Sequence, residues 1–261
     1  MSAPLTFLRR PPAPPPTGAS AAPPTALAAL PASGVAIAVS MVRPRTLGRL
    51  CADAPARAAF WSTTLHDTAL ADWLAPLRPT RLHVGSEFCE RLLPEPEQLA
   101  RTLAEASAAG LEVGLLTPVA SPEVLRALEP LFALLPAGAE VVVNDWGVAL
   151  RLREFHPLLQ PVAGRILCRM LKDPRLGNPQ YAPPAAHGFA SPWQQRLFAR
   201  VGITRVEMDM PLFAGADSFA GVPLPLGVHL PFAFVAKGRM CRTAGLARPG
   251  PERFAPRPFC H

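Results

Sequence analysis

Two kinds of segment alternate along most of this chain, and that alternation constrains its fold more than any other feature. Short apolar runs rich in β-branched residues alternate with longer amphipathic segments, in which apolar residues recur at helical spacing. The apolar runs are residues 35–42, 82–84, 111–116, 140–144, 158–162, 205–210 and 227–235. The clearest amphipathic segments are residues 68–77, 95–109, 122–135 and 192–201. Repeated strand–helix–strand units with short connections predict right-handed crossovers and a parallel sheet.

Signals at the ends of the amphipathic segments support helices there. Ser121 precedes Pro122, as an N-cap residue precedes a proline at the first helical position. Gly110 and Gly138 stand where two of these helices are expected to end. Neither GxGxxG nor GxxxxGK[ST] follows an apolar run, so a dinucleotide-binding or P-loop fold is not indicated. The number of units therefore predicts an α/β fold of the TIM-like (β/α) barrel class, incomplete or open at its C-terminal end.

The N-terminal residues differ in composition from the rest of the chain. Residues 1–33 are dominated by Pro and Ala, include PPAPPP at 11–16 and show no apolar periodicity. Such a composition is typical of an extended polyproline-type segment. We expect a disordered tail over residues 1–33 and one barrel domain over residues 34–261, with a cysteine-bearing C-terminal segment.

The chain is basic, with a formal net charge of +7, but its basic residues are scattered. Lysine occurs only at Lys172 and Lys237, and a single tyrosine is available to stack on bases, so a nucleic-acid partner is not expected. No segment reaches the roughly 18 to 20 uninterrupted apolar residues that a membrane span needs. Prolines follow Arg9 and Arg10, where an export signal would need an apolar helix. We therefore expect a cytoplasmic protein whose five cysteines are reduced.

Polar residues follow the predicted strands, where a parallel barrel places its functional groups. Glu87 follows the second apolar run and is a candidate pocket carboxylate, although it could instead pair with a nearby arginine such as Arg91. Asn144, Asp145 and Trp146 follow the fourth run and are the other pocket candidates. Asp145 could equally be the N-cap of a helix that follows it.

Three cysteines form a candidate metal site. Cys89 and Cys241 follow the second and seventh apolar runs, so we expect them on the same face, and Cys260 lies in a coil rich in Pro and Arg. Thiolates brought together from separate loops can hold an iron–sulfur cluster or a soft metal. Zinc is the alternative, although no CxxC pair is present, and a cysteine can also be a small buried residue that binds nothing. The last interpretation is favoured for Cys51 and stays open for Cys168.

Three segments also resemble sequence motifs of a known protein family. LHVGSEFCERL at 82–92 resembles a "YLGE-x-x-C" strand end, and EVVVNDWGVALRL at 140–152 resembles an "E-x-x-D-x-G" step after a fourth strand. GVHLPFAFVAKGRMCRTAGL at 227–246 resembles an "HLP-x-A-x-x-x-R-C-x-T-A" segment and is the most specific of the three. Together they resemble the collagenase-like peptidase superfamily, and specifically its UbiU/UbiV branch, over residues 35–261.

The resemblance implies a [4Fe–4S] cluster, with Cys89, Cys241 and Cys260 as ligands. The branch places a fourth cysteine just beyond Cys260, whereas this chain ends at His261. We expect that the C-terminus is truncated. The alternatives are that Cys168 or His261 completes the site, or that one iron is open.

UbiU and UbiV act together in the oxygen-independent hydroxylation of ubiquinone biosynthesis. The resemblance therefore implies a hydroxylase subunit with a small-molecule quinone precursor as substrate, in a heterodimer with a second family member. Other members hydroxylate RNA bases or are classed as peptidases, so RNA-base hydroxylation, hydrolysis and a non-catalytic scaffold role remain alternatives. Hydrolysis has no support from motifs, because GxSxG and HExxH are absent and His156, His187 and His229 have no evident nucleophile partner.

Overall fold

The structure is a computed structural model. It describes residues 36–41, 47–168, 188–189, 191–210, 219–230, 233–234, 245 and 248–254. The expected tail, residues 1–33, lies outside the described residues.

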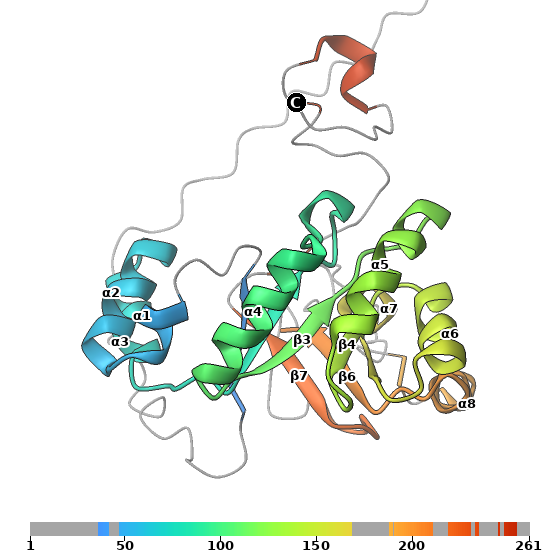
Figure 1. The fold of residues 1–261 in the computed structure, drawn as a ribbon, viewed down its shortest axis with the longest axis horizontal. Helices are drawn as coiled ribbons and strands as arrows, with labels where there is room; N and C mark the ends of the chain where they lie inside the picture. Colours follow the sequence, from blue (N-terminus) through green and yellow to red (C-terminus); the bar gives the residue numbers. More distant parts are fainter. Residues whose placement is uncertain are drawn as a thin grey trace, which may run out of the picture. The chain divides into compact units, whose positions relative to one another are not determined.

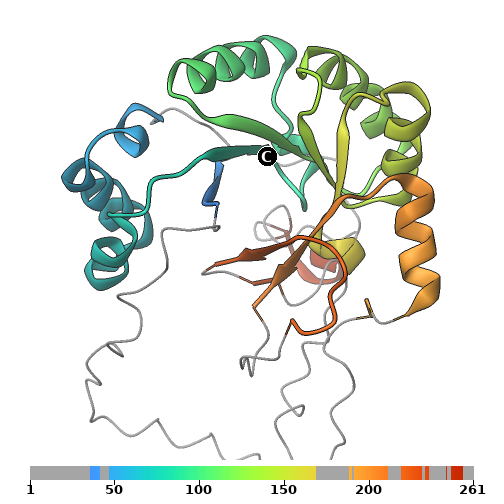
Figure 2. The ribbon, with the colours of Figure 1, turned by 90° about the horizontal axis from the view of Figure 1, so that it is seen from below.

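Seven parallel strands form one sheet, in the order β1-β2-β3-β4-β5-β6-β7. The strands are β1 (Ala38–Met41), β2 (Arg81–Gly85), β3 (Glu112–Leu116), β4 (Glu140–Val143), β5 (Gln160–Ala163), β6 (Arg205–Asp209) and β7 (Leu226–His229). Because neighbours in the sheet are neighbours in the chain, every connection steps in the same direction, which a doubly wound sheet does not do. The sheet curls into an open half-barrel with helices in an arc outside it (Figures 1 and 2).

Helices occupy the connections between the strands (Figure 1). They are α1 (Leu47–Cys51), α2 (Ala54–Leu65), α3 (Thr68–Leu74), α4 (Pro96–Ala108), α5 (Pro122–Leu134), α6 (Trp146–Phe155), α7 (Arg165–Cys168) and α8 (Pro192–Val201), with 3-10 helices η2 (Glu90–Leu92) and η4 (Gly250–Phe254). Side chains of Asp53, Asp67, Ser121 and Asp145 accept hydrogen bonds from the first turns of α2, α3, α5 and α6. None of the described helices is both long and apolar enough to cross a bilayer.

The two faces of the sheet carry different side chains, because successive residues of a strand point to opposite sides. The convex face packs against the helices in the main core, and its strand residues include Leu82, Val84, Val113, Leu115, Val141, Val143, Val206 and Met208. Leu116, Val142 and Val162 form a separate small cluster on the concave face. Apart from Ala38 on β1, the remaining concave positions of the strands are polar, charged or glycine, and they supply the candidate site.

The predicted strands are confirmed with small shifts at their ends. The seventh run was expected to be a strand over residues 227–235, but the strand ends at His229. Gly138 was expected to end a helix, whereas α5 already ends at Leu134. Leu135 adopts an extended backbone (ψ 138°), the conformation that a residue before proline prefers, and Gly138 lies in the turn that follows (φ 82°).

Gly85 at the end of β2 offers a test of how closely β2 packs against β3. Its φ is +97°, and a Cβ there would lie 2.5 Å from the backbone oxygen of Leu116 on β3. Gly110 also has a positive φ of +70°, but nothing lies within 4 Å of its would-be Cβ. Gly110→Ala should therefore cost only the strain of a left-handed backbone, about 1 kcal/mol. Gly85→Ala should add overpacking and cost about 3 kcal/mol. Urea unfolding of both variants measures the difference, and equal losses would contradict the contact between β2 and β3.

Candidate functional site

The concave face carries an ionic layer near the amino ends of its strands. Arg81 on β2 pairs with Glu112 on β3 and, at 2.7 Å, with Glu140 on β4. Arg205 on β6 reaches the same Glu140 at 2.6 Å and pairs with Glu207 at 2.9 Å. These contacts join β2, β3, β4 and β6 through side chains as well as through the backbone.

A second polar layer lies at the carboxyl ends of the strands. Arg165, the first residue of α7, binds Glu87 after β2 with Nε at 2.9 Å from Oε2, and binds Asp209 at the end of β6 with Nη1 at 2.6 Å from Oδ1. Glu87 and Asp209 are 2% and 1% exposed. Burial alone would lower the pKa of Arg165, but its hydrogen bonds to Glu87 and Asp209 and their charges outweigh burial and raise it. This guanidinium therefore stays charged between two buried carboxylates.

Asn144 contributes its side-chain amide to this second polar layer. Its Nδ2 donates to the backbone oxygen of Thr117 at 3.0 Å and to Glu87 Oε1 at 3.3 Å, and its Oδ1 accepts from the backbone N–H of Ile166 at 3.0 Å. The buried side chain thus spans the ends of β3, β4 and β5. A Cβ on Gly164 would collide with it at 2.4 Å, so glycine at that position leaves room for Asn144.

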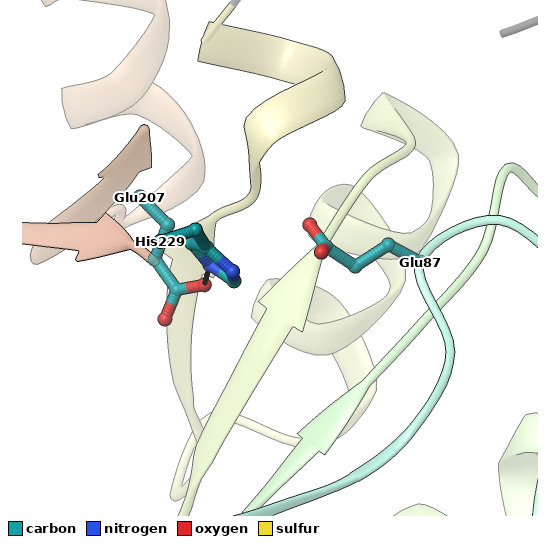
Figure 3. A group of neighbouring side chains, drawn as sticks. All are labelled: Glu87, Glu207 and His229. Atoms are coloured by element: carbon teal, nitrogen blue, oxygen red, sulfur yellow. Dashed lines mark hydrogen bonds and ion pairs between the residues drawn. The ribbon is translucent and has the colours of Figure 1, made fainter. Parts of the chain in front are cut away.

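Glu207 and two histidines lie between the two layers. His229 Nε2, at the end of β7, hydrogen-bonds Glu207 Oε2 at 2.6 Å, and the carboxylate of Glu87 faces this pair (Figure 3). Burial would raise the pKa of Glu207, but the hydrogen bond from His229 and the nearby basic side chains outweigh it and lower the pKa to about 2. The carboxylate of Glu207 is therefore ionised at neutral pH.

His83 reaches the same carboxylate from β2. Its side chain is 4% exposed and crosses over Gly114, where a Cβ would lie 2.9 Å from His83 Cδ2. Its Nε2 lies 3.9 Å from Glu207 Oε1 and has no hydrogen-bond partner. Burial lowers the pKa of His83, so the ring is neutral at pH 7.

Two of the four predicted pocket residues, Glu87 and Asn144, meet in this network. Glu87 forms its ion pair with Arg165, which the sequence did not suggest. Asp145 caps α6, its Oδ1 accepting from the backbone N–H of Gly147 at 2.7 Å. The indole of Trp146 packs against Phe198 of α8 with ring centroids 5.9 Å apart, and Trp146 also contacts the main core.

The loop after β2 places Cys89 close to these residues. Ser86 Oγ accepts hydrogen bonds from the backbone N–H groups of Phe88 and Cys89, both at 3.2 Å, and so shapes the turn that carries Cys89. Cys89 is half-buried. The ring of Phe88 packs against Phe234 at 5.1 Å between centroids, which brings the chain after β7 against this loop.

The other cysteines are placed differently. The Cys168 thiol is 1% exposed in the main core and donates to the backbone oxygen of Ala163 at 3.3 Å. Cys51 is half-buried and packs against the same core. Cys241, Cys260 and His261 lie outside the described residues, so their ligand roles remain predictions.

Several residues of the site escaped the sequence interpretation: His83, Arg165, Arg205 and Glu207, which is the partner of His229. A signal for part of this set exists in the sequence. In 205–209 the charged residues Arg205, Glu207 and Asp209 alternate with apolar ones, as they must if one face of a strand is polar. Arg165 has no such pattern, because its two partners lie 78 and 44 residues away.

Removing Arg165 should destabilise the fold strongly. Arg165→Met deprives two buried carboxylates of this counter-ion and should cost about 3 to 5 kcal/mol in the free energy of unfolding. Arg126→Met is the matched control, because Arg126 pairs with Glu123 on the exposed surface of α5 and such pairs contribute less than about 1 kcal/mol. Denaturant titrations compare the two, and a loss for Arg165→Met as small as that of the control would contradict the ion-pair role.

The cysteines should differ in reactivity. Burial raises the pKa of the Cys168 thiol to about 12, so almost no thiolate forms there at pH 8. Iodoacetamide should therefore modify the native protein at the half-exposed Cys89 much faster than at Cys168. Mass spectrometry of peptides after timed labelling measures both rates. In denaturant the two rates should converge, and fast native labelling of Cys168 would show that its thiol is accessible.

Comparison with known proteins gives no further guide. No protein-family model matches the chain, and neither a curated protein nor a solved structure matches it significantly.

Proposed function

We propose that this protein is an iron–sulfur protein of the UbiU/UbiV type, a cytoplasmic subunit that assists an oxygen-independent hydroxylation together with a second family member. In this proposal the open half-barrel is the described part of a TIM-like (β/α) barrel. The support comes from two sources, the sequence motifs around Cys89 and Cys241 and the position of the Cys89 loop.

One contact carries the proposal. Phe88, beside Cys89, packs on Phe234, which lies seven residues before Cys241. The Arg165 guanidinium lies over both rings, at 5.2 Å from Phe88 and 5.8 Å from Phe234. The chain that leads to Cys241 therefore starts against the loop that carries Cys89, as a cluster held by both thiolates requires.

The described cysteines fit such a cluster unequally. Cys89 is half-buried at the carboxyl end of the sheet, a setting open to a cluster. Cys168 is a poor fit, because its thiol faces the apolar core and burial raises its pKa to about 12, whereas a ligand must be a thiolate. We therefore propose Cys89, Cys241 and Cys260 as ligands and leave Cys168 out of the set.

In this proposal, the second polar layer, at the carboxyl ends of the strands, supplies the groups that bind the substrate. The Arg165 guanidinium lies over Phe88, the residue before Cys89, and in this proposal it binds an oxygen atom of a small polar substrate such as a quinone precursor. Asn144 is 1% exposed, and in this proposal it orients Glu87 rather than contacting the substrate. A bound cluster would supply a redox centre next to these groups. The chain's own contribution is to hold the amide and the guanidinium in fixed positions through Thr117, Glu87 and Asp209.

Metal and sulfide analysis tests this function. The protein is purified without oxygen, and iron, acid-labile sulfide and zinc are quantified for the wild type and for Cys89→Ser, Cys241→Ser and Cys260→Ser. We expect iron and sulfide in the wild type and a loss of most of both in each variant, because a cluster needs each of its thiolate ligands. Cys51→Ser and Cys168→Ser are the controls and should retain iron. An iron-free wild-type protein would refute the cluster, and zinc in its place would favour a zinc site.

A further inference from the structure

Three side chains from three strands bring metal-binding atoms together. Glu87, Glu207 and His229 each offer one ligand atom, and these atoms all lie within 4.8 Å of one another (Figure 3). They come from the loop after β2, from the middle of β6 and from the end of β7. Two of the three residues are buried and the third is partly buried. The open half-barrel is what brings strands so distant in the chain to one place.

A buried imidazole nitrogen without a hydrogen-bond partner lies close to the same group. His83 is 4% exposed, and its Nε2 lies 3.9 Å from Glu207 Oε1 without a hydrogen-bond partner. A buried polar atom without a partner is costly, and a site that contains one often has an unfilled role for it. A ring nitrogen of an imidazole can offer its lone pair to a metal ion. His83 thus supplies a further nitrogen donor close to Glu207.

The charge of the surrounding face also favours a cation. Its described residues include five carboxylates, Glu87, Glu112, Glu140, Glu207 and Asp209, and three guanidiniums, Arg81, Arg165 and Arg205. Counting only these carboxylates and guanidiniums, the described groups carry two more negative than positive charges. A divalent ion would balance that excess.

We propose that Glu87, Glu207 and His229, with His83 beside them, form a binding site for a divalent transition-metal ion such as Mn²⁺, Fe²⁺ or Zn²⁺. Two carboxylates and two imidazoles match this class of ion, whereas Mg²⁺ and Ca²⁺ prefer oxygen donors alone. The site uses no cysteine, so its ligands are distinct from those of the proposed cluster.

The geometry closes around such an ion with small movements. Ligand atoms about 2.1 Å from a tetrahedral metal are roughly 3.4 Å from one another. The hydrogen-bonded pair of Glu207 Oε2 and His229 Nε2 would open from 2.6 Å, and the longest separation, at most 4.8 Å, would shorten. Rotations of the side chains can supply changes of this size without moving a strand.

The carboxylates are already oriented by other side chains, as metal ligands usually are. Asn144 and Arg165 hydrogen-bond Glu87, and Arg205 hydrogen-bonds Glu207 at 2.9 Å. Such outer contacts hold ligand oxygens in position and are worth about 10- to 100-fold in metal affinity. The two layers of ion pairs therefore serve as the support of the central site.

Binding of Mn²⁺ tests the proposal directly. Mn²⁺ favours nitrogen and oxygen ligands over thiolates, so it separates this site from the cysteines. The full chain is stripped with a chelator and titrated with Mn²⁺, and the free ion is followed by its EPR signal. We expect a single Mn²⁺ ion per chain, with affinity lowered about tenfold or more by His229→Asn, Glu207→Gln, Glu87→Gln or His83→Asn.

Two controls separate a specific site from general effects. Glu129→Gln and His156→Asn alter a similar pair, with Glu129 Oε2 and His156 Nε2 2.9 Å apart on α5 and at the end of α6, and should leave Mn²⁺ binding unchanged. Cys89→Ser should also leave it unchanged, although it abolishes the cluster of the proposed function. Loss of Mn²⁺ binding in Cys89→Ser would show that the site needs this cysteine and would overturn the separate ligand set.

His229→Asn is the decisive variant, because this side chain is partly exposed and its loss should not unfold the protein. Circular dichroism confirms its fold. Mn²⁺ should raise the Tm of the wild type but not that of His229→Asn, since only an ion that binds the native state stabilises it. Absence of binding to the folded wild type at millimolar Mn²⁺, or equal binding by folded His229→Asn, would overturn the proposal.

Discussion

The guanidinium of Arg165 between Glu87 and Asp209 is the contact on which the carboxyl edge of the sheet depends. It joins the loop after β2, the start of α7 and the end of β6, all with side chains almost closed to solvent. Two carboxylates that faced each other there without a cation would repel, and each would bind a proton or draw in water. Their position relative to Asn144 and Cys89 therefore follows from the position of one arginine.

This use of charge distinguishes the concave face from an ordinary barrel interior. Such interiors are usually filled by branched apolar side chains in layers. Among the described residues of this face, only Leu116, Val142 and Val162 form an apolar cluster, and glycines at Gly114, Gly164 and Gly227 leave space for larger polar neighbours. Burying ions is costly even when they are paired, so apolar packing would stabilise the fold at least as well. A face built this way is typical of a binding or reaction site rather than of a core.

The strands and most of the helices packed on their convex face were predictable from the sequence, because the spacing of apolar residues determines them. The convex residues of the strands are Val, Leu and Met at alternate positions, and every predicted strand is present. The second strand was expected over 82–84 because charged Arg81 and conformationally free Gly85 look like the ends of an apolar run, yet both belong to β2. Helix α2 escaped prediction because it is rich in alanine and buries only Arg57 and Phe60, which leaves no clear apolar stripe.

The sequence predicted residues of the candidate site only where their position directly after a strand identifies them. Glu87, Asn144 and Cys89 follow strand ends, so the general rule for parallel sheets finds them. Asp145 satisfies the same rule but caps α6, because the side chain of the residue before a helix is drawn to the free N–H groups of the first turn. The pairing of Arg165 with Glu87 and of Glu207 with His229 depends on the curl of the sheet, which no local pattern records.

One loop links the two proposed sites. Ser86 shapes a turn in which Glu87 points into the buried network while Cys89, two residues on, remains half-buried at its rim. Two residues of extended chain span at most about 7 Å between Cα atoms, so a cation held by Glu87 and a cluster held by Cys89 would be near neighbours, separated by that span plus the reach of the two side chains. A positive ion at that separation would favour the more negative state of its neighbour. Occupancy of the carboxylate and histidine site would thereby stabilise the reduced form of a cluster at Cys89.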